Sequence, residues 1–177
     1  LAKDNGMSFK YVSREAYRGK NEISFIDDLK KEFGDFYLIP EGGSNTLAVK
    51  GCAEIVENIH VDYDVICCAC GTGGTIAGVI ASVNDSKQVV GFPALKGGSF
   101  LVKDIDQLLL NYEKMFSKSI ENTSWKLITD YHFGGYAKIK DELVAFVKAF
   151  KSDNKIELDL IYTGKMLFGL YDMIKTS

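Results

Sequence analysis

The chain has 177 residues, a length typical of one domain or of one domain with part of a neighbour. Hydrophobic residues make up 46% of it, which is enough for a sizeable core, and no apolar run approaches the length of a membrane span. A net charge of −3 and a pI near 5.4 argue against a protein that binds nucleic acid or a membrane surface.

Apolar periodicity and turn residues predict alternating helices and strands. A helix ends at Gly6, residues 7–13 and 36–39 are predicted strands, and a helix over 22–33 lies between them. After a polar loop over 41–45, the predicted elements are a helix over 46–58, a strand over 61–70, a helix over 75–83, a strand over 88–92, a helix over 101–115, a strand over 125–128, and helices over 142–150 and 164–174. This alternation predicts an α/β fold with an open, mainly parallel sheet and helices on both faces.

The four cysteines are Cys52, Cys67, Cys68 and Cys70, and three of them fall in the predicted strand 61–70. A metal or redox site is one interpretation, and small buried side chains are the other. The chain has only two histidines, which favours buried side chains and predicts no metal site. Reduced cysteines are typical of the cytoplasm, which is the location we expect.

The most informative stretch is the glycine-rich turn after the strand over 61–70. Gly71, Thr72, Gly73, Gly74 and Thr75 lead from that strand into a helix. Glycines allow a ligand to approach the main chain closely, and the free N–H groups of the first helical turn attract anions. A phosphate site is one interpretation, and a tight strand–helix connection is the other.

Two common nucleotide motifs do not fit this turn. No Lys-Ser or Lys-Thr follows Gly78, as a P-loop requires, and Ile76 stands where the dinucleotide motif needs its third glycine. The turn is therefore better suited to one phosphate group than to a pyrophosphate.

Three further loops contain candidate functional residues. In loop 41–45, Ser44 and Asn45 are candidates for substrate contact or for a helix N-cap. Tyr136 follows two glycines and offers a phenol as acid, base or stacking face, or is a surface aromatic residue. Tyr162 and Thr163 follow a predicted strand end, where Thr163 is either a partner for a ring nitrogen or an N-cap.

Four stretches of the chain, taken in order, resemble the 1-aminocyclopropane-1-carboxylate deaminase / D-cysteine desulfhydrase family. They are residues 39–45, 70–78, 131–136 and 161–165, so the resemblance covers nearly the whole chain. The family consists of pyridoxal-phosphate enzymes with the tryptophan-synthase-β-like fold. The resemblance therefore implies a lyase or deaminase that acts on a small amino acid and releases ammonia and a 2-oxo acid.

The resemblance also implies roles for single residues. Gly71, Thr72, Gly73, Gly74 and Thr75 match the loop that holds the cofactor phosphate, Tyr136 and Tyr162 match two active-site tyrosines, and Thr163 matches the residue that faces the pyridine nitrogen. The deaminases have a glutamate at that last position and the desulfhydrase-like members a threonine. A neutral threonine leaves the ring a weaker electron sink, which favours β-elimination of a good leaving group over opening a cyclopropane ring.

None of Lys10, Lys50, Lys138 and Lys165 lies in a context that matches the family's Schiff-base lysine. We therefore expect a chain truncated at both ends, with residues 1–35 in a partial small domain and residues 36–177 in a partial cofactor domain, and inactive alone. A homodimer is implied by resemblance only, and the sequence does not fix the substrate. The alternative from a different functional class is a non-catalytic α/β module that binds a small anion.

Overall fold

The computed structural model describes residues 1–176 and divides the chain into two compact units, Leu1–Leu38 and Ile39–Ser177. The first unit contains a short 3-10 helix, Lys3–Asn5, and the helices α1 (Arg14–Arg18) and α2 (Ile23–Phe33). Gly6 ends the 3-10 helix with a φ of 80°, as its predicted capping role requires. The assignment of this region to a partial small domain stays a prediction.

The strands predicted over 7–13 and 36–39 are wrong, because the structure has no strand at either place. Residues 7–13 do have the alternating pattern, and the rings of Phe9 and Tyr11 stack on each other with centroids 6.3 Å apart. A strand also needs a hydrogen-bonded neighbour, however, and the described residues 1–38 contain no strand to pair with. Lys10 of this segment instead forms an ion pair with Glu32 of α2.

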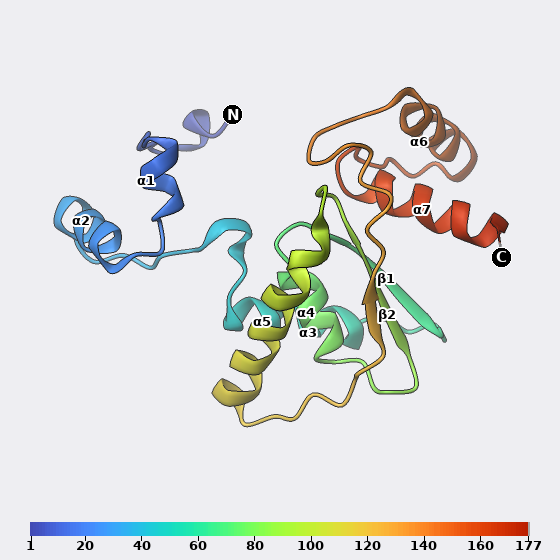
Figure 1. Cartoon of the computed structure of the whole chain (residues 1–177), viewed down its shortest axis with the longest axis horizontal. Helices are drawn as coiled ribbons and strands as arrows, with labels where there is room; N and C mark the ends of the chain where they lie inside the picture. The colour runs from blue at the N-terminus through green and yellow to red at the C-terminus, as the bar shows by residue number, and fades with distance from the viewer. Residues whose placement is uncertain (177) are drawn as a thin grey trace. The chain divides into compact units, whose positions relative to one another are not determined.

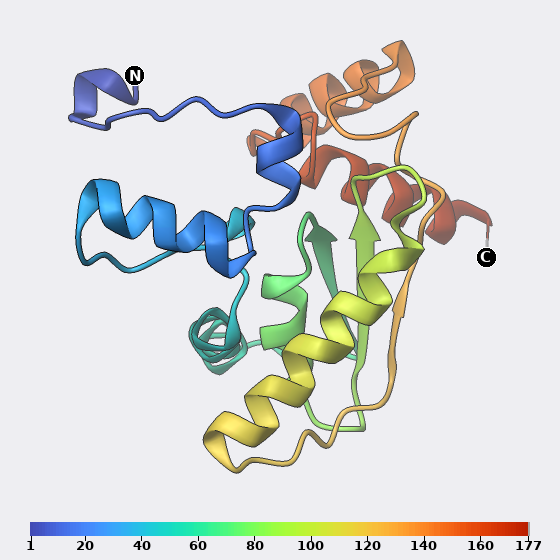
Figure 2. The same cartoon turned by 60° about the vertical axis from the view of Figure 1, so that its left-hand side comes forward.

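The second unit is built on a parallel sheet of three strands in the order β1-β2-β3. The strands are β1 (Val65–Cys70), β2 (Gln88–Pro93) and β3 (Trp125–Leu127). Figure 2 shows β1 and β2 side by side and pointing the same way. In their register Val65 pairs with Gln88 and Cys70 with Pro93. The glycine turn therefore leaves the sheet at the carboxyl end of β1, the edge where open α/β sheets bind ligands.

Helices cover both faces of this sheet. They are α3 (Thr46–Glu57), α4 (Gly74–Ile80), α5 (Leu101–Phe116), α6 (Asp141–Asn154) and α7 (Thr163–Thr176). Two neighbouring residues of β2 identify the faces: Gly91 lies against Ile76 of α4, and the Phe92 ring lies against Gly169 of α7. In Figure 1, α3, α4 and α5 gather on one side of the strands and α6 and α7 on the other. The predicted open α/β architecture is confirmed.

The core lies mainly between the sheet and the layer of α3, α4 and α5. It is built from branched aliphatic side chains at helical spacing in α4 and α5, which is the pattern that predicted those helices. Its fully buried members include Val49, Ile76, Ile80, Val89, Leu101 and Ile105. No helix within residues 1–176 is both long and apolar enough to cross a membrane.

Candidate functional site

The glycine turn forms one wall of a cavity of about 260 Å³ at the end of β1. Gly73 adopts a φ of 86°, a conformation that side chains disfavour, and α4 begins at the next residue. A Cβ atom at Gly73 would lie 2.9 Å from the Ile105 side chain, and one at Gly74 would lie 2.7 Å from Ser44 Oγ. The glycines are therefore required by the close packing of the turn. The cavity is lined by Gly42, Ser44, Ala69, Cys70, Gly71, Thr72, Gly73, Gly74, Thr75, Ile76 and Tyr162.

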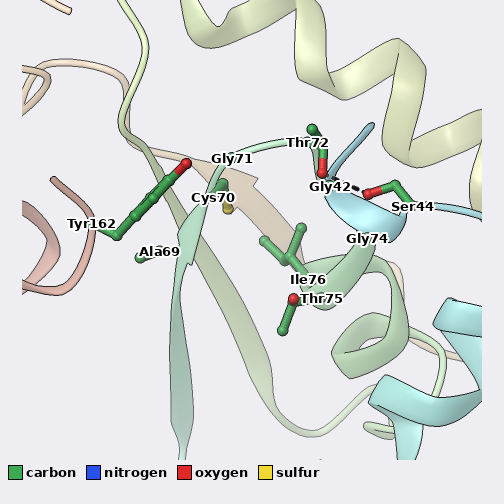
Figure 3. A pocket seen from close by; sticks show the side chains of 11 residues that line it. Gly42, Ser44, Ala69, Cys70, Gly71, Thr72, Gly74, Thr75, Ile76 and Tyr162 are labelled. Carbon is green, nitrogen blue, oxygen red and sulfur yellow. Dashed lines mark hydrogen bonds between the residues drawn. The ribbon is translucent and has the colours of Figure 1, made fainter. Parts of the chain in front are cut away.

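Loop 41–45 packs against the glycine turn through two hydroxyl groups. Ser44 Oγ and Thr72 Oγ1 are hydrogen-bonded at 2.6 Å, and Figure 3 shows this bond on the opposite side of the turn from Tyr162. Gly42, in a 3-10 turn over Glu41–Gly43, has a φ of 68° and lies directly against Thr72. Asn45 instead caps α3, because its side chain accepts a hydrogen bond of 2.8 Å from the Ala48 N–H. Of the two predicted loop residues, Ser44 lines the cavity and Asn45 serves as the N-cap.

Tyr162 connects the glycine turn to Tyr136. A Cβ atom at Gly71 would lie 3.3 Å from Tyr162 Oη, so the phenol lies beside the turn. The rings of Tyr136 and Tyr162 meet edge to face, with centroids 6.0 Å apart and planes at 61°. Burial, with contributions from Tyr136 and from the charge of Asp159, raises the pKa of Tyr162. Both phenols therefore lie together, and the Tyr162 phenol keeps its proton at neutral pH.

Asp159 organises the segment that contains Tyr162 and Thr163. Its carboxylate accepts hydrogen bonds from the backbone N–H groups of Ile161 (2.8 Å), Tyr162 (2.6 Å) and Thr163 (2.9 Å), and from the Thr163 hydroxyl (2.5 Å). Partial burial opposes ionisation, but these hydrogen bonds outweigh it and lower the pKa of Asp159 to about 2. The Asp159 side chain is therefore ionised at neutral pH and holds the N-terminal end of α7 in place.

Thr163 begins α7, and its hydroxyl both donates to Asp159 and accepts from the Asp159 N–H at 3.2 Å. It is not among the residues that line the cavity within the described part of the chain. Its contact with a cofactor ring therefore stays a prediction.

The loop before Tyr136 is held by a buried lysine. Lys165, in the first turn of α7, is only 2% exposed, and its Nζ donates to the carbonyl oxygens of His132 (3.0 Å) and Gly135 (2.9 Å). Burial lowers the pKa of Lys165, and the negative charge of Asp159 opposes this shift. His132 also contributes to the loop, since its Nδ1 accepts from the Gly134 N–H at 2.8 Å.

The cysteines of β1 are free thiols, and Cys70 lines the cavity. Cys70 is buried, and hydrogen bonding to Cys68 and burial both raise the pKa of its thiol. A thiol with a raised pKa is a poor nucleophile, so Cys70 acts as a small apolar wall of the cavity.

Known proteins are similar to this chain along nearly its whole length. The chain is 29% identical over 98% of its length to a putative 1-aminocyclopropane-1-carboxylate deaminase of Pyrococcus horikoshii, and 31% identical over 97% to a protein of the same description from Thermotoga maritima. The chain is thus similar, over nearly its whole length, to proteins described as 1-aminocyclopropane-1-carboxylate deaminases. It is also 28% identical over 96% of its length to the mitochondrial bifunctional D-cysteine desulfhydrase/1-aminocyclopropane-1-carboxylate deaminase of Arabidopsis thaliana. No protein-family profile matches the chain.

A solved structure of an ACC deaminase homologue superposes on 99% of the chain with a TM-score of 0.83 and 27% identity. The predicted family resemblance and fold class are thereby confirmed. The chain spans about half the length of these relatives: 52% and 58% of the two putative deaminases, 45% of the plant enzyme and 56% of the solved structure.

Two residues that hold the site received no role from the sequence. Asp159 lies in the loop just before α7, and an aspartate in a loop often accepts a hydrogen bond from the backbone N–H two residues on, so this role could have been inferred. Lys165 gave no such signal, because the pattern of α7 alone does not show that its ammonium group is buried.

Proposed function

We propose that this chain provides the cofactor and substrate site of a pyridoxal-phosphate-dependent lyase or deaminase that acts on a small amino acid. The single observation that carries the proposal is the cavity in which the glycine turn and Tyr162 meet, with Tyr136 against Tyr162. The relatedness to proteins named as deaminase and desulfhydrase supports the proposal.

The residues present fit a phosphate group. Gly71, Gly73 and Gly74 line the cavity and have no side chains, so the turn presents its backbone there. Thr72 and Thr75 add two hydroxyl groups at the same place. In this proposal Gly71, Thr72, Gly73, Gly74 and Thr75 hold the cofactor phosphate, and the Ser44–Thr72 hydrogen bond fixes the shape of the turn. Because α4 has only seven residues, close backbone contacts contribute more to binding than a long helix dipole.

Pyridoxal phosphate, when bound, supplies an electron sink that lets an amino acid lose its α-proton and a group from its β-carbon. The chain's own residues orient the substrate and handle protons. In this proposal the Tyr162 phenol, whose raised pKa keeps it protonated, serves the substrate as a hydrogen-bond donor. Tyr136, at the edge of Tyr162, orients the substrate or relays a proton through this pair.

For the substrate, we propose an amino acid with a good β-leaving group, such as D-cysteine, in preference to 1-aminocyclopropane-1-carboxylate. The reason is the neutral Thr163, which stands where the resemblance places a glutamate in the deaminases. The Asp159 carboxylate accepts a hydrogen bond from the Thr163 hydroxyl, so Thr163 serves a ring nitrogen as a donor only when its hydroxyl turns away from Asp159.

The reaction also needs a lysine that forms an imine with the cofactor. Lys165 does not suit this task, because its ammonium group is bound by two carbonyl oxygens of loop 131–136. We therefore propose that the 177-residue chain binds the phosphate without turning over an amino acid on its own. A homodimer of the whole protein and a cytoplasmic location belong to this proposal and rest on the resemblance and on the free cysteines.

The test is a substrate comparison. The chain, and the same chain joined to the upstream half of a relative that supplies the lysine, are incubated with pyridoxal phosphate and either D-cysteine or 1-aminocyclopropane-1-carboxylate. We expect 2-oxo acid release only from the joined protein, and faster release from D-cysteine. Release from the cyclopropane substrate alone would contradict the argument from Thr163. Phosphate binding without turnover in either protein would favour the anion-binding module.

A further inference from the structure

Lys165 occupies a place that is unfavourable for a lysine. It is buried, and it lies in the first turn of α7, where the positive end of the helix dipole repels a cation. Lysine is rarely buried in proteins unless its charge is paired or hydrogen-bonded. An unbranched apolar side chain would fill the same space without desolvating a charge. The ammonium group therefore needs an explanation beyond packing.

Its two acceptors bracket a strained turn. The carbonyl oxygens of His132 and Gly135 both receive a hydrogen bond from Lys165 Nζ. Two residues with side chains have positive φ here: Phe133, between the two acceptors, at 55°, and Ala137, two residues after Gly135, at 54°. Such angles are unfavourable for residues with a Cβ atom. The turn has an internal backbone hydrogen bond, from the Gly135 N–H to the His132 carbonyl oxygen at 3.0 Å. The buried ammonium group adds a contact from outside the turn to the carbonyl oxygens of both residues.

The residue at the end of this turn is Tyr136. Its side chain is 54% exposed, so burial does not fix its position, which instead depends on the backbone of residues 132–137. Its ring meets Tyr162, which is held from the other side because Asp159 accepts the Tyr162 N–H. The segment of Tyr162 also contains Lys165, three residues further on. The lysine thus links the loop of one tyrosine to the segment of the other.

We propose that Lys165 is a positioning residue of the candidate site: its buried ammonium group fixes the turn over 132–135 and thereby holds Tyr136 against Tyr162. The effect on catalysis rests on the proposed function of the two tyrosines, whereas the positioning itself does not. If Lys165 only filled space, its ammonium group would have no effect on the position of Tyr136. Methionine has similar length and no N–H donors, so Lys165→Met would then leave Tyr136 where it is.

The experiment uses the full 177-residue chain labelled with 3-fluorotyrosine, without any cofactor. The ¹⁹F resonances of Tyr136 and Tyr162 are assigned from their loss in Tyr136→Phe and Tyr162→Phe. We expect Lys165→Met to move the Tyr136 resonance to the position of a solvent-exposed tyrosine and to abolish the ring–ring nuclear Overhauser effect between Tyr136 and Tyr162. Lys175→Met, which removes an exposed lysine of the same helix, is the control and should change neither.

Amide resonances of β2 and of residues 71–75 show whether the variant is folded. A folded Lys165→Met protein with an unchanged Tyr136 resonance would overturn the proposal. A second measurement needs no variant. The backbone order parameters of residues 132–137 in the unmodified chain should be about 0.85, and values below about 0.6 would also overturn the proposal. Because pyridoxal phosphate is absent throughout, failure of the chain to bind this cofactor would count against the proposed function and leave the positioning result intact.

Discussion

The Thr163 hydroxyl donates a hydrogen bond of 2.5 Å to the Asp159 carboxylate, and this pair fixes the start of α7 beside the cavity. The same carboxylate accepts the N–H of Tyr162, so one charged side chain sets the position of two candidate site residues. The first prediction therefore concerns Asp159.

Asp159→Asn should lower the stability of the protein at neutral pH by about 1 kcal/mol. A fall in pKa from 3.8 to about 2 corresponds to ~2 kcal/mol, and the partial exposure of the carboxylate reduces its effective value. Because the folded pKa lies below the unfolded value, this stabilisation is present above pH 4 and is lost as the pH falls toward 2. Urea unfolding at several pH values measures it. Asp153→Asn, which removes an exposed carboxylate in the last turn of α6, is the control, and an equal loss in both variants would contradict the account.

The second prediction concerns the Tyr162 phenol. Burial is the main reason that its pKa is raised, with smaller contributions from Tyr136 and from the charge of Asp159. Asp159→Asn should therefore lower the pKa of Tyr162 but leave it above 10, the ordinary value for a tyrosine. The ¹³Cζ shift of Tyr162 in a chain labelled with ¹³C-tyrosine, followed against pH, measures the change. A Tyr162 pKa that is higher in Asp159→Asn than in the unmodified chain would contradict the claim that the charge of Asp159 raises it.

The third prediction concerns the packing of α3 against α4. A Cβ atom at Gly78 would lie 2.7 Å from the Val49 carbonyl oxygen and would also overlap Cys52. Gly78→Ala should therefore destabilise the protein by about 1–3 kcal/mol through overpacking. Gly51→Ala is the matched control, because Gly51 lies exposed in α3 with open space around its Cα, and alanine there should stabilise by about 0.5–1 kcal/mol. Denaturant midpoints that shift in the same direction for both variants would refute this packing argument.

The fourth prediction concerns the phosphate site. Thr75 is exposed at the cavity and offers a hydroxyl group there. Removing one hydrogen bond to a charged group costs about 1.5–3 kcal/mol, so Thr75→Val should weaken binding of pyridoxal phosphate about 10- to 100-fold. Calorimetric titration measures the affinity, and the denaturant midpoint should change little. Thr123→Val, which changes an exposed segment before β3, is the control and should bind pyridoxal phosphate as tightly as the unmodified chain does. If Thr75→Val also binds it as tightly as the unmodified chain, Thr75 does not contact the phosphate.

The sequence predicted the sheet and its helices because those elements have strong, uninterrupted patterns. The apolar run of β1, the glycines after it and the amphipathic repeat of α5 act locally, so they can be recognised without a structure. The segment 7–13 has an equally good alternating pattern and still forms no strand. Whether a strand forms depends on a partner elsewhere in the chain, and local pattern does not contain that information.

The site was also predicted only in part, because local patterns can be recognised in a sequence and contacts between distant residues cannot. Glycine spacing identified the turn over 71–75, and the aromatic and glycine residues identified the loop before Tyr136. The residues that hold these loops, Asp159 and Lys165, act through hydrogen bonds to backbone groups that become neighbours only in the fold. Lys165 contacts residues 30 and 33 positions away, so its role could not be inferred from the helix in which it lies.

The most direct test of the central claim is to map pyridoxal phosphate on the ¹⁵N-labelled 177-residue chain by NMR, with pyridoxal that lacks the phosphate as the matched ligand. We predict saturable shifts of the backbone amides of residues 71–75 with pyridoxal phosphate, together with shifts of Tyr162. The same amides should respond at least 10-fold more weakly to pyridoxal, because the turn recognises the phosphate group. Equal responses to both ligands, or shifts confined to residues outside the cavity, would contradict the claim that the glycine turn holds the phosphate of this cofactor.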